Sequence, residues 1–212
     1  MLGERVRIAL ETGHFEQDEA RAMRGHFKPD DRLLDLGSGT GYIATIAGRI
    51  AGGEAVTGVE ALPHMVEVAK TNLLRNNVHG ASMLWGAAVP SAHQGEQVRF
   101  AARRQFWASS ILQEGQARRS QHIDVPALRI DELLRRSRAT VVSCDIEGGE
   151  LDLFETDLPQ DVRLIILEIH PKHYGDVGTG RVFNALSRND MVYCARRSIG
   201  STVVFRRITA ST

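Results

Sequence analysis

Short apolar, β-branched segments alternate with segments of helical periodicity along most of this chain, and this alternation limits the fold more than any other feature of the sequence. Residues 32–36, 54–60, 82–89, 140–146 and 163–170 have the composition of buried strands. Their nearly continuous apolar runs are typical of parallel strands that helices cover on both faces. The pattern therefore predicts an α/β fold with a doubly wound, mostly parallel sheet.

Helices are predicted between these strands. Residues 42–50 follow a glycine-rich turn, residues 62–77 carry apolar side chains at helical spacing, and residues 130–137 precede the fourth strand. Near the end of the chain, residues 191–197 and 201–207 have strand composition and are separated by a short link. We expect these last two segments to form an antiparallel pair.

Two regions interrupt the alternation. Residues 1–28 precede the first strand and have the character of one or two helices. Residues 90–130 fit no unit of strand and helix, but residues 97–103 and 122–130 resemble strands, which predicts a β-rich insertion between the third and fourth strands. No internal repeat or linker composition divides the chain, so residues 1–212 are predicted to form one domain.

The overall composition disfavours several classes of protein. The chain has 26 basic and 26 acidic residues, so no net charge favours nucleic acid or an acidic membrane as a partner. Its first residues carry charges where a signal peptide requires an apolar stretch, and no segment approaches the ~18 apolar residues of a membrane span. Cys144 and Cys194 lie in apolar segments, which indicates buried thiols in a reducing compartment. We therefore expect a cytoplasmic protein, either monomeric or homodimeric.

A glycine-rich loop, DLGSGTG at residues 35–41, follows the first predicted strand. Glycines at this place let the backbone turn sharply and approach a ligand. A dinucleotide-binding loop would have the spacing G-x-G-x-x-G, whereas Tyr42 occupies the last of those positions here. The observed G-x-G-x-G spacing, with Asp35 two residues before the first glycine, resembles the S-adenosylmethionine loop of class I methyltransferases. Glu60, at the end of the second strand, can accept hydrogen bonds from both ribose hydroxyls of an adenosine.

Acidic residues are concentrated at the ends of the fourth and fifth strands. The segment CDIEGGE places Asp145, Glu147 and Glu150 directly after an apolar run. The fifth strand ends with Glu168 and His170, which the two-residue period of a strand turns to the same side. Glu150 is interpreted as an acid in the first turn of a following helix, where it favours the positive end of the helix dipole. Because ligands bind across the carboxyl ends of such strands, the other four side chains are predicted to form one polar cluster.

Together these segments resemble the FkbM-type methyltransferases. The resemblance rests on LLDLGSGTGYIA at the glycine loop, DIEGGE after the fourth strand and ILEIH at the end of the fifth, with ETGHFEQDE and VPALRIDELL as further matching segments. It covers about residues 11–170. Many members carry Ala-Asn after the first glycine, where this chain has Ser38, Gly39 and Thr40, so no subfamily is assigned.

The resemblance implies the strand order 3-2-1-4-5-7-6 and S-adenosylmethionine as the cofactor. It also implies transfer of a methyl group to a hydroxyl group of a small molecule or sugar. An alcohol is a poor nucleophile until a base removes its proton, so His170 or Glu147 is expected to be the base. Asp145 and Glu168 are expected to orient the acceptor or the base. The four groups could also bind a divalent cation, but no metal is the favoured expectation. The residues expected at the cofactor are Asp35, Gly37, Ser38, Gly39, Gly41, Tyr42, Glu60, Ala61, Ala87 and Asp145.

Other interpretations stay open at this point. A methyltransferase acting on an RNA or protein nitrogen is disfavoured by the balanced charge and by the lack of an Asn/Asp-Pro-Pro-aromatic segment at the fourth strand. A module that only binds the cofactor would not need the acidic cluster, and Tyr42 disfavours a nicotinamide dehydrogenase. His170, which precedes Pro171, can also be a packed residue at a strand end. Glu16 is either a surface acid or part of a segment that folds over the cofactor or acceptor.

Overall fold

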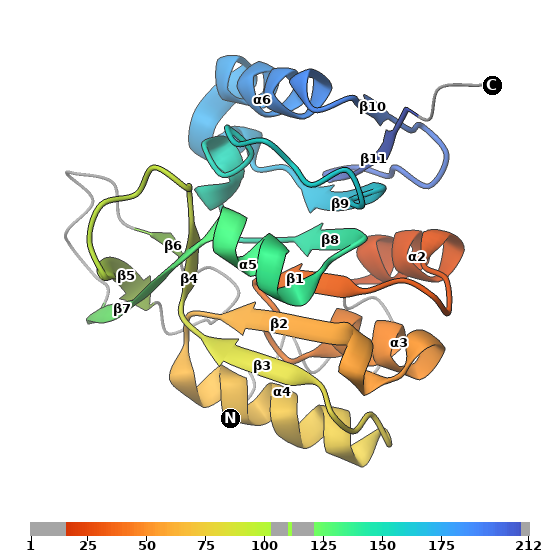
Figure 1. Cartoon of the computed structure of the whole chain (residues 1–212). Helices are drawn as coiled ribbons and strands as arrows, with labels where there is room; N and C mark the ends of the chain where they lie inside the picture. Colours follow the sequence, from red (N-terminus) through yellow and green to blue (C-terminus); the bar gives the residue numbers. More distant parts are fainter. Residues whose placement is uncertain (1–15, 103–109, 112–120, 209–212) are drawn as a thin grey trace.

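The computed structural model describes residues 16–102, 110–111 and 121–208. Its centre is a seven-stranded sheet in the order β10-β11-β9-β8-β1-β2-β3 (Figure 1). β11 runs antiparallel to both of its neighbours, and the other neighbouring strands are parallel. Numbered within this sheet alone, the order is 3-2-1-4-5-7-6, so the predicted order and the doubly wound class are confirmed. The strands are β1 (Leu33–Leu36), β2 (Val56–Glu60), β3 (Ser82–Trp85), β8 (Val141–Cys144), β9 (Leu164–Glu168), β10 (Met191–Tyr193) and β11 (Thr202–Arg207).

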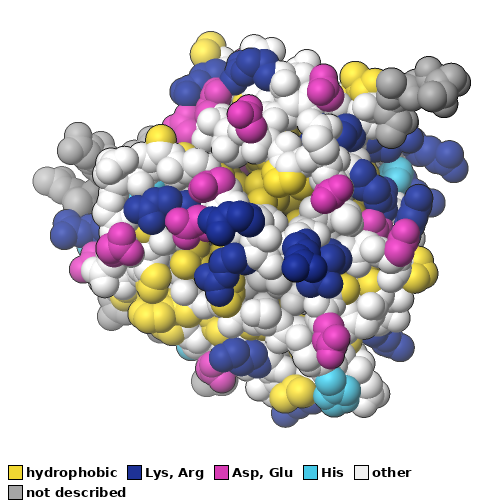
Figure 2. Space-filling model, in the orientation of Figure 1, with side chains coloured by type: hydrophobic (Ala, Val, Ile, Leu, Met, Phe, Trp, Pro, Cys, Tyr) yellow, Lys and Arg dark blue, Asp and Glu magenta, His cyan; other side chains and the backbone are white. Residues whose placement is uncertain are grey.

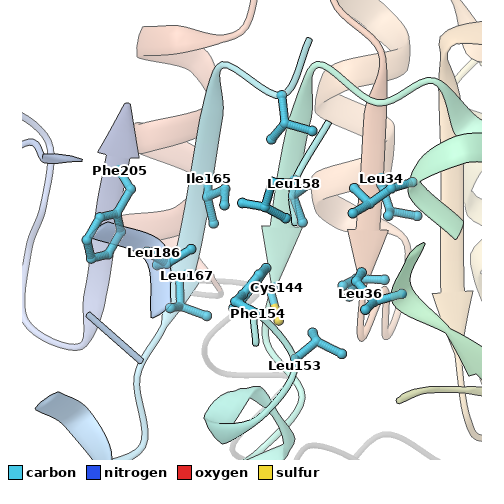
Figure 3. Packing of buried hydrophobic residues seen from close by; sticks show 14 of the residues in the cluster. Leu34, Leu36, Cys144, Leu153, Phe154, Leu158, Ile165, Leu167, Leu186 and Phe205 are labelled. Carbon is cyan, nitrogen blue, oxygen red and sulfur yellow. The ribbon is translucent and has the colours of Figure 1, made fainter. Parts of the chain in front are cut away.

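One face of the central strands packs against the two helices α5 (Ile130–Ser137) and α6 (Pro171–Arg188). Side chains of a strand alternate between faces, so Leu34 of β1 and Ile165 of β9 point into the same apolar layer. Figure 3 shows Phe205 of β11 next to Ile165, and Leu34 farther along the same layer. Complete burial of such a side chain stabilises the fold by about 1.5–3 kcal/mol. Alternate residues of the apolar strand segments in the sequence therefore form this face of the core.

The opposite face carries the helices α2 (Gln17–His26), α3 (Tyr42–Ala51) and α4 (Pro63–Arg75). Leu33 of β1 and Val141 of β8, each next in sequence to a residue of the first face, pack into this second cluster. Both central strands are buried along their whole length. Helices on both faces explain why these strands are apolar without interruption.

The third predicted strand ends earlier than expected. A single strand over residues 82–89 is wrong, because the chain leaves the main sheet after β3 and forms β4 (Ala87–Val89), which pairs with β7 (Gln121–Arg129) in a second sheet. Gly86 lies between the two strands, and a Cβ at this position would be 2.7 Å from the side chain of Leu128. The close approach of β7 therefore requires a glycine where the strand changes sheets.

The predicted β-rich insertion is confirmed as a small four-stranded sheet. In it β7 pairs antiparallel with β5 (Gln97–Ala102), which pairs with β6 (Ser110–Ile111). Val98 of β5 and Val125 of β7 share an apolar cluster with Met65 of α4. The insertion is thus fixed against the beginning of α4.

Helix α6 connects β9 to β10, and sequence analysis missed it. Pro171 begins the helix, and Gly175, Gly178 and Gly180 follow, each of which lowers helix propensity by about 1 kcal/mol relative to Ala. Gly175 has a φ of 66° and kinks the helix. The second half is held by burial, since Val182 is fully buried in the first apolar cluster. Tertiary packing here outweighs the local preference of the sequence.

Further expectations concern the chain ends, the cysteines and the surface. The helical segment predicted over residues 1–28 is represented by α2, and residues 1–15 lie outside the described residues. Cys144 and Cys194 are buried free thiols. Within the described ranges, no helix has the length and apolar character needed to cross a membrane. Basic and acidic side chains are interspersed on the face shown in Figure 2.

Candidate active site

The predicted site residues follow the carboxyl ends of four parallel strands. The glycine loop, residues 37–41, follows β1, and Glu60 ends β2. Residues 145–150 follow β8, and residues 168–170 include the end of β9. These strands are neighbours in the order β2-β1-β8-β9, so their carboxyl ends lie at one edge of the sheet (Figure 1). The structure therefore brings the predicted cofactor residues and the predicted catalytic residues to the same edge.

The glycine loop is bent by three glycines with φ angles of 81°, 50° and 77° in chain order. Gly37 and Ser38 donate their backbone N–H groups to the carbonyl oxygen of Val59, at 3.0 Å each, which ties the loop to β2. A Cβ on Gly37 would lie 1.8 Å from the carbonyl oxygen of Asp145. The loop thus needs a glycine at this position because it closely approaches the segment that follows β8.

Glu60 lies against the glycine loop. Its Oε2 accepts a hydrogen bond from the backbone N–H of Gly39 at 2.9 Å, and its Oε1 accepts one from Leu62 at 2.8 Å. The side chain is buried, and burial raises its pKa. A carboxylate offers about four acceptor positions, so positions remain for the hydroxyl groups of a ribose. The role of Glu60 at a ribose stays a prediction that this geometry allows.

The other predicted cofactor residues lie in β1, at the start of α3, after β2 and at the start of β4. Asp35 is 3% exposed, burial raises its pKa to about 7, and its Oδ2 has no hydrogen-bond partner among the described residues. Tyr42 begins α3 and accepts a hydrogen bond from Arg24 at 3.2 Å. Ala61 and Ala87 are buried in one apolar cluster. A buried carboxylate oxygen without a partner is an atom that a cationic group of a ligand can satisfy.

His170 is at the centre of the predicted catalytic residues. Its Nδ1 lies 2.8 Å from Oε1 of Glu150, and its Nε2 lies 3.5 Å from Oδ1 of Asp145 and 3.6 Å from Oε2 of Glu147. Glu168 joins them, because one polar atom each of Asp145, Glu168 and His170 lie within 4.8 Å of one another. The structure thus brings the four residues together, while their catalytic roles stay predictions. A cation could fit such a spacing, so the expectation of no metal also stays a prediction.

The interpretation of Glu150 as the first acid of a helix is wrong. In the described structure, residues 150–158 form no α-helix, and only a short 3-10 helix, η3 (Gly149–Leu151), is present. Glu150 is fully buried. It accepts hydrogen bonds from the hydroxyl of Tyr174 at 3.0 Å and from the backbone N–H of Gly148 at 2.9 Å. A buried carboxylate requires such partners, so these bonds and the imidazole, rather than a helix dipole, account for its position.

The acidic surroundings shift pKa values within the cluster. Burial lowers the pKa of His170, but its hydrogen bond to Glu150 and the charges of Glu150, Asp145 and Glu147 outweigh burial and raise the pKa to about 9. Burial and the charge of Glu168 raise the pKa of Asp145 to about 8. His170 is therefore positively charged at neutral pH and offsets part of the surrounding negative charge.

Helix α2 contributes an acid to this edge that sequence analysis missed. Glu19 is 4% exposed, and its place on the apolar stripe of α2 was the available signal. Glu16 precedes the helix, and its Oε1 lies 4.0 Å from the position that a Cβ would take on Gly39. Burial raises the pKa of both glutamates, and the charges of Asp35 and Asp145 raise it further. The helix thus extends the acidic cluster toward the glycine loop.

The chain is similar to one protein family and to several solved methyltransferase structures. The profile of the methyltransferase FkbM domain matches residues 35–193. The crystal structure of magnesium protoporphyrin IX methyltransferase from Synechocystis, with bound S-adenosylmethionine, has a TM-score of 0.53 and 14% identity, and covers 98% of this chain and 86% of that chain. The precorrin-6y C5,15-methyltransferase of Geobacter metallireducens has a TM-score of 0.50 and 11% identity, and covers 91% of this chain and 88% of that chain. At these identities the similarity shows a shared fold.

Curated relatives match a shorter region. The ribosomal protein L11 methyltransferase of Thermus thermophilus is 38% identical over 73 residues, which are 34% of this chain and 28% of that protein. The protein of the same name from Clostridium perfringens is 33% identical over 81 residues, which are 37% of this chain and 26% of that protein. The matched regions thus span about a quarter of the length of these relatives.

Proposed function

Because this chain belongs to the FkbM methyltransferase family, we propose that it transfers the methyl group of S-adenosylmethionine to a hydroxyl group of a small molecule or sugar. The observation that carries this proposal is the position of His170. Its Nε2 lies 3.5 Å from Asp145, and the backbone of Asp145 in turn contacts the glycine loop at Gly37. A base for an alcohol therefore stands next to the segment that resembles a cofactor loop.

The residues of the glycine loop fit the cofactor. Among the described residues, a Cβ on Gly39 would have no neighbouring atom closer than 3.9 Å, so this part of the chain leaves the loop open on this side. Oδ2 of Asp35 has no hydrogen-bond partner in the described part of the chain, and Glu60 keeps free acceptor positions. We assign Glu60 to the ribose hydroxyls, and Asp35 with the loop to the charged methionine end. S-adenosylmethionine, when bound, supplies a methyl group that is already activated.

The chain's own residues then act on the acceptor. In its neutral form, His170 takes the hydroxyl proton at Nε2 while the acceptor oxygen attacks the methyl carbon. Asp145 and Glu168 orient the hydroxyl for attack in line with the leaving sulfur. The acids around the imidazole stabilise the imidazolium that forms. Glu147, with Oε2 3.6 Å from the same nitrogen, is the alternative base.

Calorimetry tests the cofactor assignment. We expect wild-type protein to bind S-adenosylmethionine and S-adenosylhomocysteine and not NAD. Glu60→Ala should lose this binding, because the substitution removes the ribose acceptor and leaves the backbone N–H groups of Gly39 and Leu62 without a partner. The matched control is Glu54→Ala, which removes an exposed acid six residues before the end of β2. Wild-type protein that binds neither sulfur ligand would contradict the proposal.

A transfer assay tests the acceptor class. Protein is incubated with methyl-labelled S-adenosylmethionine and a panel of hydroxylated sugars, polyols and macrolide-like compounds. Label is then followed into products, and S-adenosylhomocysteine release is measured. We expect ether products from members of this panel. Label that enters only protein or RNA would contradict O-methylation of small molecules.

Methylation of a protein nitrogen is the second candidate. The observation that favours it is the regional similarity to ribosomal protein L11 methyltransferases. Asp145, Ile146, Glu147 and Gly148 stand at the end of β8 where an amide- or amine-directed enzyme would carry Asn/Asp-Pro-Pro-aromatic, which supports the hydroxyl acceptor instead. Purified ribosomal protein L11 is therefore included in the transfer assay as an acceptor. Its labelling would favour this second candidate.

A further inference from the structure

We propose that Glu150 is a positioning residue for the reaction: it holds Nδ1 of His170 and thereby turns Nε2 toward the acceptor hydroxyl. This inference rests on the proposed function and deepens it, because it names the group that prepares the base. Glu150 itself is fully buried and lies behind the imidazole as seen from Asp145 and Glu147.

Three hydrogen bonds fix the carboxylate of Glu150. Oε1 is 2.8 Å from Nδ1 of His170 and 3.0 Å from the hydroxyl of Tyr174, and Oε2 accepts the backbone N–H of Gly148 at 2.9 Å. The backbone N–H of His170 donates to the same Tyr174 hydroxyl at 2.6 Å. His170, Tyr174 and Glu150 thus form a closed ring of hydrogen bonds. His170 is therefore held through both its backbone N–H and its imidazole, and the ring has little freedom to turn.

This ring determines the tautomer of the neutral imidazole. An ionised carboxylate only accepts hydrogen bonds, so the contact with Glu150 places the proton of neutral His170 on Nδ1. The lone pair then lies on Nε2, the nitrogen that faces Asp145 and Glu147. A hydroxyl that enters this space meets an acceptor atom instead of an N–H group. The positioning of Nε2 as a base therefore depends on a residue that does not touch the acceptor.

The groups that face His170 come from each element packed around it. Asp145, Glu147 and Glu150 follow β8, Glu168 ends β9, and α6 supplies two residues, Tyr174 and His173, whose imidazole centroid lies 5.7 Å from that of His170. Among the carboxylates, Glu150 alone is fully buried and within 3 Å of the imidazole. Its charge should therefore influence the imidazolium more than that of the other acids, which water screens in part.

The proton movement is balanced in this arrangement. As the acceptor oxygen bonds to the methyl carbon, the bond from that carbon to sulfur breaks and its electron pair stays on sulfur, which gives neutral S-adenosylhomocysteine. The hydroxyl proton moves to Nε2, and the imidazolium donates from Nδ1 to Glu150. The base is reset when this proton passes to solvent.

Nuclear magnetic resonance tests the inference without any acceptor. His170 is titrated in isotopically labelled protein with a chelator present, for wild type, Glu150→Gln and Tyr174→Phe. We expect a pKa of about 9 in wild type, and in Glu150→Gln a fall of about one unit or more. Tyr174→Phe keeps the charge and should shift the pKa less. The matched control is Asp152→Asn, which removes an exposed acid of the same segment that pairs with Arg181.

Kinetics separate positioning from a purely structural role. With an acceptor from the panel, Glu150→Gln should lower kcat by about 100-fold or more and move the acidic limb of the pH–rate profile to lower pH. The affinity for S-adenosylmethionine should stay unchanged, and Glu150→Asp should recover part of kcat.

Several outcomes would overturn the inference. One is an unchanged pKa of His170 in Glu150→Gln. Another is a Glu150→Gln protein that unfolds at a lower temperature but keeps the wild-type pH–rate profile, because its role would then be purely structural. If Glu150→Gln does not fold, the wild-type protein decides: the contact with Glu150 requires the neutral imidazole to carry its proton on Nδ1, so tautomer signals that place the proton on Nε2 would overturn the inference. A wild-type chain that shows the titration but does not bind S-adenosylmethionine would contradict the proposed function and not the hydrogen-bonded ring.

Discussion

The two parts of the sheet edge that we assign to the cofactor (the cofactor side) and to the acceptor (the acceptor side) are built in different ways. On the cofactor side the backbone makes the main contacts: the glycine loop donates to the carbonyl of Val59, and Glu60 accepts N–H groups from Gly39 and Leu62. On the acceptor side, side chains from separate segments meet, as in the contact of Glu150 with His170. Substitutions on the first side should therefore disturb conformation, whereas conservative substitutions on the second should disturb chemistry and leave the fold intact.

The largest effect is expected from His170→Asn on the acceptor side. Loss of a general base lowers the rate by about 100- to 10,000-fold. Affinity for S-adenosylmethionine should stay within about twofold, because no backbone contact of the glycine loop is lost. Release of S-adenosylhomocysteine and calorimetry measure the two quantities, with the exposed His79→Asn as the control. A parallel loss of cofactor affinity would show that the two sides do not act separately.

On the cofactor side, Gly37→Ala is expected to destabilise the protein by about 3 kcal/mol or more. The added Cβ would lie 1.8 Å from a backbone oxygen, in a residue whose φ is 81°. Gly52→Ala is the matched control, because Gly52 has a φ of 85° and no atom of the described residues lies within 4 Å of the added Cβ. It should cost less, about 1–3 kcal/mol, which is the strain of a backbone conformation (φ 85°, ψ 152°) that glycine favours. Urea denaturation measures the free energy of unfolding of both variants. Equal losses would mean that the glycine loop shifts to accept the added Cβ without further destabilisation.

The stability of the free protein should fall as pH rises from about 6.5 to 9. The pKa of His170 is raised to about 9, so its contribution is fully present below its unfolded value near 6.5 and is lost as pH passes 9. The raised pKa values of Asp145, about 8, and Asp35, about 7, have the same sign, because the folded state binds more protons than the unfolded state.

Melting temperatures in ligand-free buffer across this range check the slope. Asp145→Asn serves as the comparison, since it removes one of the groups with a raised pKa and should flatten the curve. A stability that rises between pH 6.5 and 9 would mean that the acidic cluster is not compact in solution.

The smallest effect is expected from Glu19→Gln, which should stabilise the free protein by about 1 kcal/mol. The carboxyl group is buried in α2 near Asp145 and Glu16, and their charges raise its pKa. Asp18→Asn, in the first turn of the same helix, is the control and should have the opposite sign, because an acid there favours the helix dipole. Thermal unfolding compares them, and a loss of stability in Glu19→Gln would indicate a hydrogen-bonded role for this carboxylate.

The sequence was informative where the determinants are local. The glycine loop and the burial of β1 and β8 depend on adjacent residues, and their patterns predicted the sheet and the place of the site. The end of β3 depends on Leu128, which lies more than forty residues after Gly86 in the chain. The role of Glu150 depends likewise on Tyr174, beyond an entire strand. Patterns of neighbouring residues cannot predict contacts between such distant positions. The hydrogen-bonded ring around His170 could therefore be identified only from the structure.

The break at Gly86 also has an evolutionary consequence. Only this residue separates β3, at the edge of the main sheet, from β4 of the insertion sheet, and the insertion packs on the first turns of α4. Sequence drift in the insertion can therefore remodel a wall beside the carboxyl edge while the strand order and the glycine loop stay constant.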